Sequence, residues 1–347
     1  MYIKKLIWAV ALLGLLVAAY FAYFVYSAMF KPNTAFNNEE AYIYIPTGAN
    51  YNEVRSQLEP LLIDINKFDA LAKQKKYVSN IKAGKYAIKK GMNNNDIINS
   101  IRSNNLPIKV AFNNQETLED LSGRIASQIE ADSLSIINAI TSEDFLKSNG
   151  FELKTALGMY IPNSYEFFWN TSAEQFRDRM LKEYQRFWTE TRIEKAKALN
   201  LTPNQVMTLA SIVQKETSKV DERPKVAGVY LNRLKVGMPL QADPTVIYAI
   251  KEKSGDFKQV IKRVLFKDLE LDSPYNTYKY AGLPPGLITM PDISSIDAVL
   301  NYEKHDYYYF VADVNNFGYH KFAKNLSQHN RNREEYVRWI NQQGVNR

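Results

Sequence analysis

The sequence predicts an α+β protein in three parts: an N-terminal transmembrane helix within residues 1–31, a small α/β module over residues 32–106, and a larger mixed α+β domain over residues 107–347. Three observations support this division. The chain begins with a long uncharged run, continues with alternating strand and helix patterns over residues 41–105, and later shows two consecutive helices followed by a strand pair. A chain of 347 residues is long enough for two domains with cores of their own.

The first segment has the composition of a membrane span. Lys4 and Lys5 precede an uncharged run over residues 6–30, and aromatic residues gather towards its far end. About twenty apolar residues cross a bilayer as a helix, and aromatic side chains favour the interface. A cleaved signal peptide is the competing interpretation, but the run is long for one and does not end in a small-x-small cleavage site. We therefore expect a single-pass anchor in the cytoplasmic (inner) membrane, with a cytoplasmic N-terminus and the remaining chain on the outer (periplasmic) side.

Composition narrows the classes of function. The chain has 44 basic and 37 acidic residues, and this mild excess of +7 suits an acidic polymer, but no Lys/Arg run is dense enough to indicate nucleic-acid binding. The absence of cysteine excludes disulfides, thiolate metal sites and a cysteine nucleophile. The 3 histidines, His305, His320 and His329, do not have the spacing of a metal site, so we expect neither a metal nor a cofactor. His320 and His329 are candidate site or scaffold residues.

Residues 41–105 follow the pattern strand, helix, helix, strand, helix. The stretch YIYIPTGANYNEVRSQL first alternates between apolar and polar residues and then takes helical periodicity. The stretch AGKYAIKKGMNNNDIINSIRSN contains a short strand, a turn at Gly91 and an amphipathic helix that carries Ile97, Ile98 and Ile101.

The central element of the larger domain is a helix that begins after Thr202, a residue that can cap it. Val206, Leu209, Val213 and Glu216 follow one another at steps of three, four and three, so Glu216 continues the apolar stripe of this helix. A carboxyl group partly withdrawn from water has a raised pKa, as a general acid requires near neutral pH. The alternative is a glutamate at a helix end whose stem packs while its carboxylate stays hydrated.

Polar residues cluster after this helix. A second helix is indicated from about Asp221 or Glu222 until shortly before Gly237. Asp243 stands before a proline, which favours an extended or turn conformation directed back towards the helix pair. The stretch SPYNTYKYAGLPPG then brings hydroxyls and an amide, followed by a stiff turn that can hold them at low entropic cost; these polar residues are Tyr275, Asn276, Thr277 and Tyr278.

Five of these segments carry a family resemblance. The order and spacing of SIVQKET, DERPKVAGVYLNRL, LQADPTVIY, PYNTY and GLPPG resemble the YceG-like family of endolytic murein transglycosylases, and the similarity covers most of the chain after its first thirty or so residues. The resemblance implies cleavage of the β-1,4 bond between N-acetylmuramic acid and N-acetylglucosamine without water, which leaves a 1,6-anhydro end. In the family's Glu-Lys-Glu-Thr motif the second acid is catalytic, and it corresponds to Glu216. The first acid is replaced here by Gln214.

The implied reaction requires only one carboxylate. As an acid, Glu216 would protonate the glycosidic oxygen; as a base, it would then accept the proton of the sugar's own 6-hydroxyl as that oxygen attacks the anomeric carbon. Substrate-binding candidates lie in the shared motifs: Asn232, Gln241, Asp243, Thr245, Tyr275, Asn276 and Tyr278. Alternatively, Arg233 and Asp243 form a structural ion pair, and Thr245 is a cap.

The resemblance also gives expectations for the rest of the chain. Residues 32–106 resemble the LysM-like module that precedes the catalytic part of the family, so peptidoglycan binding is implied; the alternative is a spacer without glycan affinity. Pro162 and Tyr165 match a short family segment. The aromatic residues that follow could line a sugar groove or pack in the core; they are Phe167, Phe168 and Trp169. A buried strand over residues 307–311 and a hairpin near residues 315–318 are expected, and residues 173–199 are expected to form one long surface helix.

Two other functions stay open at this point. A hydrolytic muramidase needs a second carboxylate in the same cleft, for which Asp243 and Glu166 are candidates. A membrane-tethered scaffold that binds peptidoglycan without turnover is the other. The expected partners are peptidoglycan glycan strands, the membrane and, by resemblance, the peptidoglycan synthases.

Overall fold

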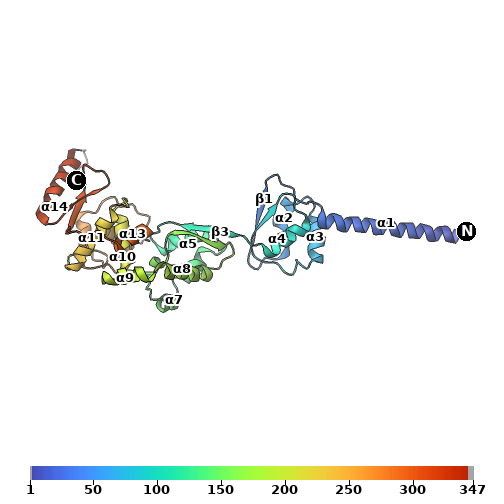
Figure 1. The fold of residues 1–347 in the computed structure, drawn as a ribbon, viewed down its shortest axis with the longest axis horizontal. Helices are drawn as coiled ribbons and strands as arrows, with labels where there is room; N and C mark the ends of the chain where they lie inside the picture. The colour runs from blue at the N-terminus through green and yellow to red at the C-terminus, as the bar shows by residue number, and fades with distance from the viewer. Residues whose placement is uncertain (1, 343–347) are drawn as a thin grey trace. The chain divides into compact units, whose positions relative to one another are not determined.

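The structure is a computed structural model that describes residues 2–342 and divides into two compact units (Figure 1). The N-terminal unit comprises the residues up to 110 together with 128–131 and 165–172. The C-terminal unit comprises residues 111–127, 132–164 and those from 173 onwards.

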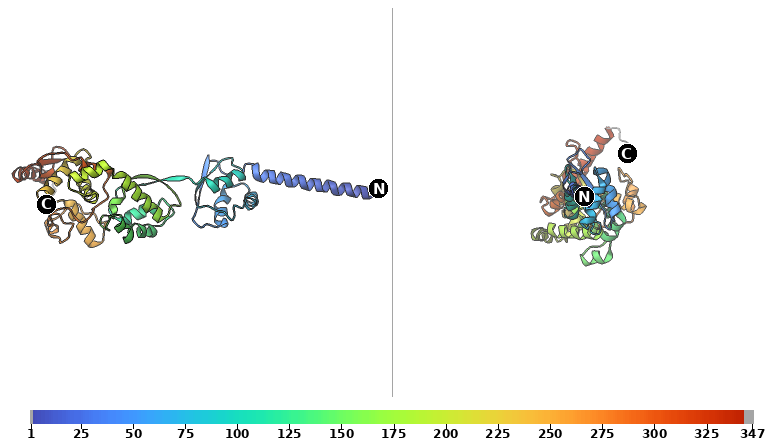
Figure 2. Two further views of the ribbon diagram at one scale, coloured as in Figure 1. Left: turned by 60° about the horizontal axis from the view of Figure 1, so that its bottom comes forward. Right: turned by 90° about the vertical axis from the view of Figure 1, so that its right-hand side faces the viewer.

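The chain begins with α1 (Tyr2–Phe30), a 29-residue helix that is long and apolar enough to cross a membrane. Its side chains are exposed along nearly the whole length, and Figure 2 shows the ribbon of this dark blue helix. Burial is confined to its last turn, where Ser27 and Ala28 are covered.

A small module follows within the N-terminal unit. Strands β1 (Glu40–Ile45) and β2 (Gly84–Lys89) pair antiparallel, with Tyr42 opposite Ala87. Between them lie α2 (Tyr51–Leu58), the 3₁₀ turn η1 (Glu59–Leu61) and α3 (Ile65–Gln74), and α4 (Asn94–Ser103) comes after β2. The predicted order of strand, helix, helix, strand and helix is therefore confirmed.

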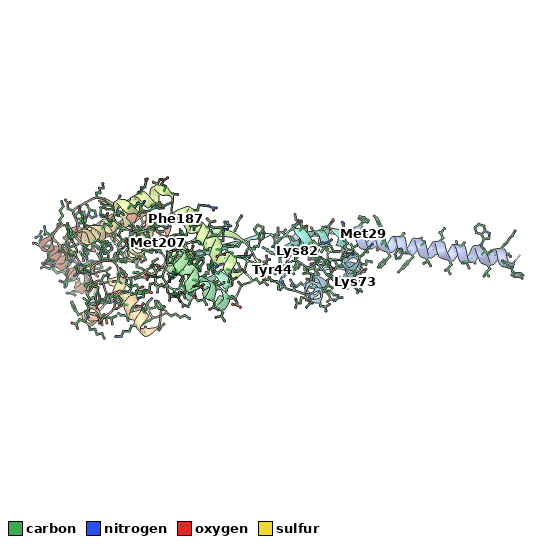
Figure 3. The ribbon with its side chains drawn as sticks, turned by 90° about the horizontal axis from the view of Figure 1, so that it is seen from below. Met29, Tyr44, Lys73, Lys82, Phe187 and Met207 are labelled. Atoms are coloured by element: carbon green, nitrogen blue, oxygen red, sulfur yellow. The ribbon has the colours of Figure 1, made fainter. Side chains whose placement is uncertain are left out.

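The first helix is built into this module. The side-chain amide of Asn94 donates to the carbonyl of Ala28 at 2.8 Å, and Asn33 donates to the Asn94 side chain at 2.6 Å and to the carbonyl of Asp64 at 2.9 Å. Met29 packs against the apolar core of the module, as its position in Figure 3 illustrates. The last turn of α1 is thus a part of the module's fold.

Short elements open the second half of the chain. Strand β3 (Pro107–Phe112) pairs with β4 (Asn163–Phe168). The helices of this stretch are α5 (Leu118–Ala126), α6 (Ser133–Ile140), α7 (Glu143–Ser148), η2 (Ala156–Met159), α8 (Ala173–Phe187) and α9 (Glu190–Ala198). The single long helix predicted over residues 173–199 was wrong, because the Thr189 hydroxyl accepts the backbone N–H of Arg192 and starts a second helix there.

Helix α10 (Pro203–Glu216) lies at the centre of the C-terminal unit. All of residues 206–213 are buried, and the helix packs against α9, α11 (Arg223–Lys235), α12 (Asp243–Ser254) and α13 (Ile293–Leu300). The 3₁₀ turn η3 (Phe266–Glu270) lies between α12 and α13 in sequence. A helix enclosed by four others has a fixed position, and so does its last residue.

The chain ends with a hairpin and a helix. Strands β5 (Tyr309–Ala312) and β6 (His320–Ala323) pair antiparallel, with Tyr309 opposite Ala323, which confirms the predicted hairpin. The prediction that its first strand is buried was wrong, because β5 is only partly buried. Helix α14 (Leu326–Gln342), red in Figure 1, packs against both strands.

Candidate active site

The site is positioned by the start and the end of α10. At its start, the Thr202 hydroxyl accepts the backbone N–H of Gln205, and the Gln205 side chain accepts the N–H of Thr202, which closes a capping box. At its end, Glu216 is the last helical residue, and its side chain is half-buried. The apolar stripe read from the sequence therefore does place this carboxylate against the core. Lys215, on another face, pairs with Glu116 instead.

The carboxylate of Glu216 has one direct side-chain partner in the described part of the chain. The hydroxyl of Tyr230, on α11, donates to Glu216 Oε2 at 2.9 Å, and Tyr230 is only 1% exposed. Burial raises the pKa of the Glu216 carboxyl, and the negative charge of Asp243 adds to this increase. The Tyr230 hydrogen bond and the positive charges of His320 and Arg233 oppose it without cancelling it. A raised pKa favours the protonated form that a general acid needs.

Asp243 lies close enough to Glu216 to influence it electrostatically. Its Oδ1 accepts the hydroxyl proton of Tyr278 at 2.6 Å. The sequence placed Asp243 in an extended or turn segment, which was wrong, because Asp243 is the first residue of α12. Pro244 fits the first turn of a helix, where its missing N–H has no partner to lose, and the change of direction occurs at Gln241, whose φ is +48°.

Arg233 is buried at 6% exposure and holds the backbone beneath the site. Its Nε donates to the carbonyl of Tyr308 at 2.6 Å, and another guanidinium nitrogen donates to the carbonyl of Leu240 at 2.5 Å. Its hydrogen bonds join α11 to the hairpin and to the segment before α12, whereas Asp243 is bonded to Tyr278. The structural ion pair between Arg233 and Asp243 is therefore not formed.

A second acidic residue, Glu222, lies just before α11 and fixes a histidine. Its Oε1 accepts the backbone N–H of His320 at 2.6 Å, and its Oε2 lies 2.8 Å from the ring Nδ1. Burial opposes ionisation of Glu222, but the bonds to His320 outweigh it and lower the pKa of this carboxyl. Because Nδ1 faces a carboxylate, it carries a proton. The ring packs edge-on against Phe310, 5.0 Å between centroids, and Phe310 packs against Tyr230 at 5.9 Å.

The sequence identified His320 as a candidate site or scaffold residue but did not identify Glu222 as its partner. Glu222 is the residue that caps α11 by position, yet its side chain makes no capping hydrogen bond. In the sequence, an acidic residue just before a helix, such as Glu222, indicates only the start of that helix. Its bond to His320, 98 positions later, cannot be recognised from a local sequence pattern.

Three of the predicted binding residues bond to the backbone of their own unit. The Asn276 amide donates to the carbonyls of Leu269 and Leu271, at 2.8 Å each. The Asn232 amide donates to the carbonyls of residues 305 and 307, at 2.8 and 3.0 Å. Thr245 is fully buried, and its hydroxyl bonds to the carbonyl of residue 242 at 2.7 Å rather than capping a helix start. These side chains shape the loops around the site.

The other predicted binding residues differ in exposure. Tyr275 is fully buried, and its ring packs on that of Tyr248 with centroids 4.5 Å apart. Tyr278 is half-buried and bonded to Asp243, and the side chain of Gln241 is exposed. The structure therefore brings Asp243 and Tyr278 together beside Glu216, since the charge of Asp243 raises the pKa of both the Glu216 carboxyl and the Tyr278 hydroxyl.

Gln214 lies two residues before the end of α10, and its amide faces Asp292. In the orientation that satisfies both groups, the amide nitrogen donates to the two carboxylate oxygens at 3.1 and 3.0 Å and to the Ser295 hydroxyl at 2.6 Å. Asp292 also pairs with the buried Arg223 at 2.9 Å. An amide at position 214 is therefore complementary to a carboxylate already held in place.

The remaining candidates lie elsewhere. Glu166, on β4, belongs to the N-terminal unit and is exposed. In the same segment Phe167 is buried and Phe168 is 50% exposed, while the ring of Trp169 meets the edge of Tyr44 at 5.2 Å. His329 stacks on Tyr309 at 5.1 Å. Among residues 2–342, no group of three or more His, Cys, Asp or Glu side chains is arranged to hold a metal.

Comparisons with known proteins agree with the resemblance seen in the sequence. The profile of the YceG-like family matches residues 43–335. A Bacillus subtilis protein named endolytic murein transglycosylase is 32% identical over 320 residues, which are 85% of this chain and 84% of that protein. A Streptococcus pneumoniae protein of the same name is 30% identical over 92% of this chain and 62% of its own length. A crystal structure of a yceG-like protein from Listeria monocytogenes matches with a TM-score of 0.56 at 29% identity, covering 85% of this chain and 99% of that one.

Proposed function

Because the chain belongs to the YceG-like family, we propose that it is a membrane-anchored peptidoglycan lytic transglycosylase that cuts glycan strands internally through the single carboxyl group of Glu216. The relatives named endolytic murein transglycosylases support the substrate and the reaction class. The observation that carries the mechanism is the half-buried Glu216 carboxyl, whose raised pKa suits proton donation.

The reaction follows from this geometry in two steps. The protonated Glu216 gives its proton to the glycosidic oxygen, and the C1–O bond of the N-acetylmuramic acid residue breaks. The resulting carboxylate then accepts the proton of the same sugar's 6-hydroxyl while that oxygen bonds to C1, which closes the 1,6-anhydro ring. One group serves as acid and then as base, so no water is consumed. The phenol of Tyr230 can stabilise the intermediate carboxylate by its hydrogen bond of 2.9 Å.

We also propose that α1 is a retained anchor in the cytoplasmic membrane, with the site on its outer side. The bonds of the module to the last turn of α1 support retention, since the Ala28 carbonyl accepts from Asn94 and Met29 packs in the module core. Cleavage at the end of the apolar run would remove these contacts.

Residues 32–106 are proposed to be a LysM-like module that holds glycan near the site. The exposed face of β1 supports a role in sugar contact, because Tyr42 and Tyr44 are 44% and 39% exposed on the same side of the strand. Aromatic rings of this kind stack on apolar sugar faces. A sedimentation assay with purified sacculi tests it: the Tyr42→Ala/Tyr44→Ala protein should sediment less than the parent, and unchanged sedimentation indicates a spacer.

The decisive experiment is mass spectrometry of the products from purified glycan strands. The full-length protein in detergent should be used, since α1 contributes to the module core. Products one water lighter than hydrolysed strands, absent with Glu216→Gln, are the expected result. Hydrolysed reducing ends would indicate the muramidase, and strand binding by a folded protein without any product would indicate the scaffold.

A muramidase is the second candidate because Asp243 acts electrostatically on Glu216 and so supplies a second carboxylate nearby. The substitution Asp243→Asn separates the two mechanisms. A hydrolase that uses Asp243 as base or nucleophile should lose about 10²–10⁴-fold in rate. The one-carboxylate reaction should keep most of its rate, apart from the loosened bond to Tyr278.

A further inference from the structure

A cavity of about 540 Å³ lies in the C-terminal unit beside the proposed site, and the proposed mechanism makes no use of it. It is enclosed by the end of α10, the first half of α12, the loop after α12 and the segment before α5. Its chemically distinctive lining residues are Glu116, Lys215, Tyr248, Lys251, Phe257 and Lys258.

The polar wall of the cavity carries an excess of positive charge. Glu116 pairs with two lysines, with Lys215 on one carboxylate oxygen and with Lys251 on the other, at 2.8 Å for the latter. Lys251 has a side-chain exposure of only 12%, so this pair is shielded from solvent. Burial opposes ionisation of Glu116, but the two lysines outweigh it and lower the pKa of its carboxyl. With Lys258 and Asp120, three lysines face two acids, and the surplus cation favours an anionic ligand.

A second part of the lining is apolar. Ile247, Tyr248, Phe257 and Ile261 line it, and Tyr248 packs edge-on against Phe257 with centroids 5.5 Å apart. A bare inorganic anion gains nothing from such a surface. A short peptide with a free carboxylate and aliphatic side chains fits both walls.

Two residues of the cavity lining directly adjoin residues of the proposed site in sequence. Lys215 precedes Glu216 on α10, and Pro244 follows Asp243 on α12. Side chains of successive helical residues diverge by about 100°, so the catalytic carboxylate and the cavity occupy adjacent faces of one helix end. An extended peptide of three to five residues reaches about 10–17 Å, which is sufficient to pass from one face to the other.

We propose that this cavity is the subsite for the acidic peptide stem that is attached to the muramic acid residue at the cleavage site. The proposal rests on the proposed function, since the stem is the acidic peptide that peptidoglycan presents next to the cut bond. The stem's carboxylate would meet the lysines of the Glu116 cluster, and its aliphatic side chains would contact Tyr248 and Phe257. The enzyme would therefore discriminate between strands with stems and strands without them.

The test compares two substrates: glycan strands with stems, and the same strands after an amidase has removed the stems. The full-length protein should show a higher kcat/KM on strands with stems, by roughly tenfold, about the value of one well-placed charge contact. Lys258→Glu reverses an exposed charge at the cavity and should abolish most of this preference, because it lowers kcat/KM on strands with stems more than on bare strands. Lys182→Glu, an exposed substitution on α8 outside the cavity, is the matched control.

Binding of a free acidic stem tripeptide to the Glu216→Gln protein, measured by calorimetry, gives a readout that does not depend on turnover. Peptide binding that Lys258→Glu weakens supports the subsite even if no strand is cleaved, an outcome that would count against the proposed function alone. Cleavage of both strands with equal kcat/KM, together with the absence of peptide binding, would overturn the subsite and leave the proposed function standing. An equal loss on both strands in Lys258→Glu would also overturn it.

Discussion

The hydroxyl of Tyr230 donates to Glu216 Oε2 across 2.9 Å, from a tyrosine that is almost completely buried. This bond favours the ionised carboxylate and so opposes the effect of burial on the pKa of Glu216. The two residues therefore set together the pH range in which Glu216 can donate a proton.

Tyr230→Phe should raise the pKa of Glu216, because it removes a hydrogen bond to the charged form and leaves the burial unchanged. Activity that requires protonated Glu216 falls as pH rises through this pKa, so the alkaline limb of the kcat/KM profile should move to higher pH. Rates measured from pH 5 to 9 on glycan strands check this. A limb that moves to lower pH would contradict the assigned role of Tyr230.

Glu216→Gln should be at least as stable as the parent at neutral pH. Burial raises the folded-state pKa of Glu216 above its unfolded value of about 4.3, so the parent loses stability as pH rises from that value through the raised pKa. The glutamine variant does not experience this loss. Urea unfolding at pH 4 and pH 7 should show the variant gaining relative to the parent at pH 7; Glu194→Gln, an exposed residue on α9, is the control.

Gln214→Glu should leave activity little changed and reduce stability. It replaces an amide that donates to Asp292 by a second carboxylate about 3 Å away, so a hydrogen bond to a charged group is lost, at a cost on the order of 1.5–3 kcal/mol. Thermal unfolding should show the deficit at pH 7 and a smaller one near pH 4, where one carboxyl is protonated. Adding Asp292→Asn should recover part of the loss, and a double variant no more stable than Gln214→Glu would contradict this account.

Glu222→Gln should destabilise the protein above about pH 4. The bonds to His320 lower the folded-state pKa of Glu222, so its contribution is present above the unfolded value of about 4.3 and is lost as pH falls through the folded value. We expect a difference on the order of 1–3 kcal/mol at pH 7 that shrinks in acid. A difference that is constant from pH 3 to 7 would show that the charge of Glu222 is not responsible.

Local patterns predicted the elements on which the site depends. The cap at Thr202 and the apolar stripe that ends in Glu216 are both encoded within fifteen consecutive residues, and both are found in the structure. The β5–β6 hairpin and the element order of the N-terminal module were likewise readable, because each strand and helix carries its own periodicity. The resemblance to the YceG-like family is confirmed by the match over residues 43–335.

Contacts distant in sequence were not predictable in this way. Asn232 and Asn276 are polar residues in shared motifs, and such residues read equally well as ligands of a substrate or as partners of backbone carbonyls. Only the folded chain shows which carbonyls they meet. The bond from Glu222 to His320 is of the same kind, because the two residues come together through the packing of a hairpin on α11.

The union of α1 with its module has a mechanical consequence. The bond from Asn94 to Ala28 holds the last turn of the apolar helix against the folded module, and the bond from Asn33 to Asp64 holds the residues just after it. The helix and the module are therefore not joined by a flexible linker. If α1 lies in a bilayer as proposed, a tilt of this helix also tilts the module that is bonded to its last turn. Changes in bilayer thickness that tilt the helix would then alter how far above the lipid the module's β-sheet stands.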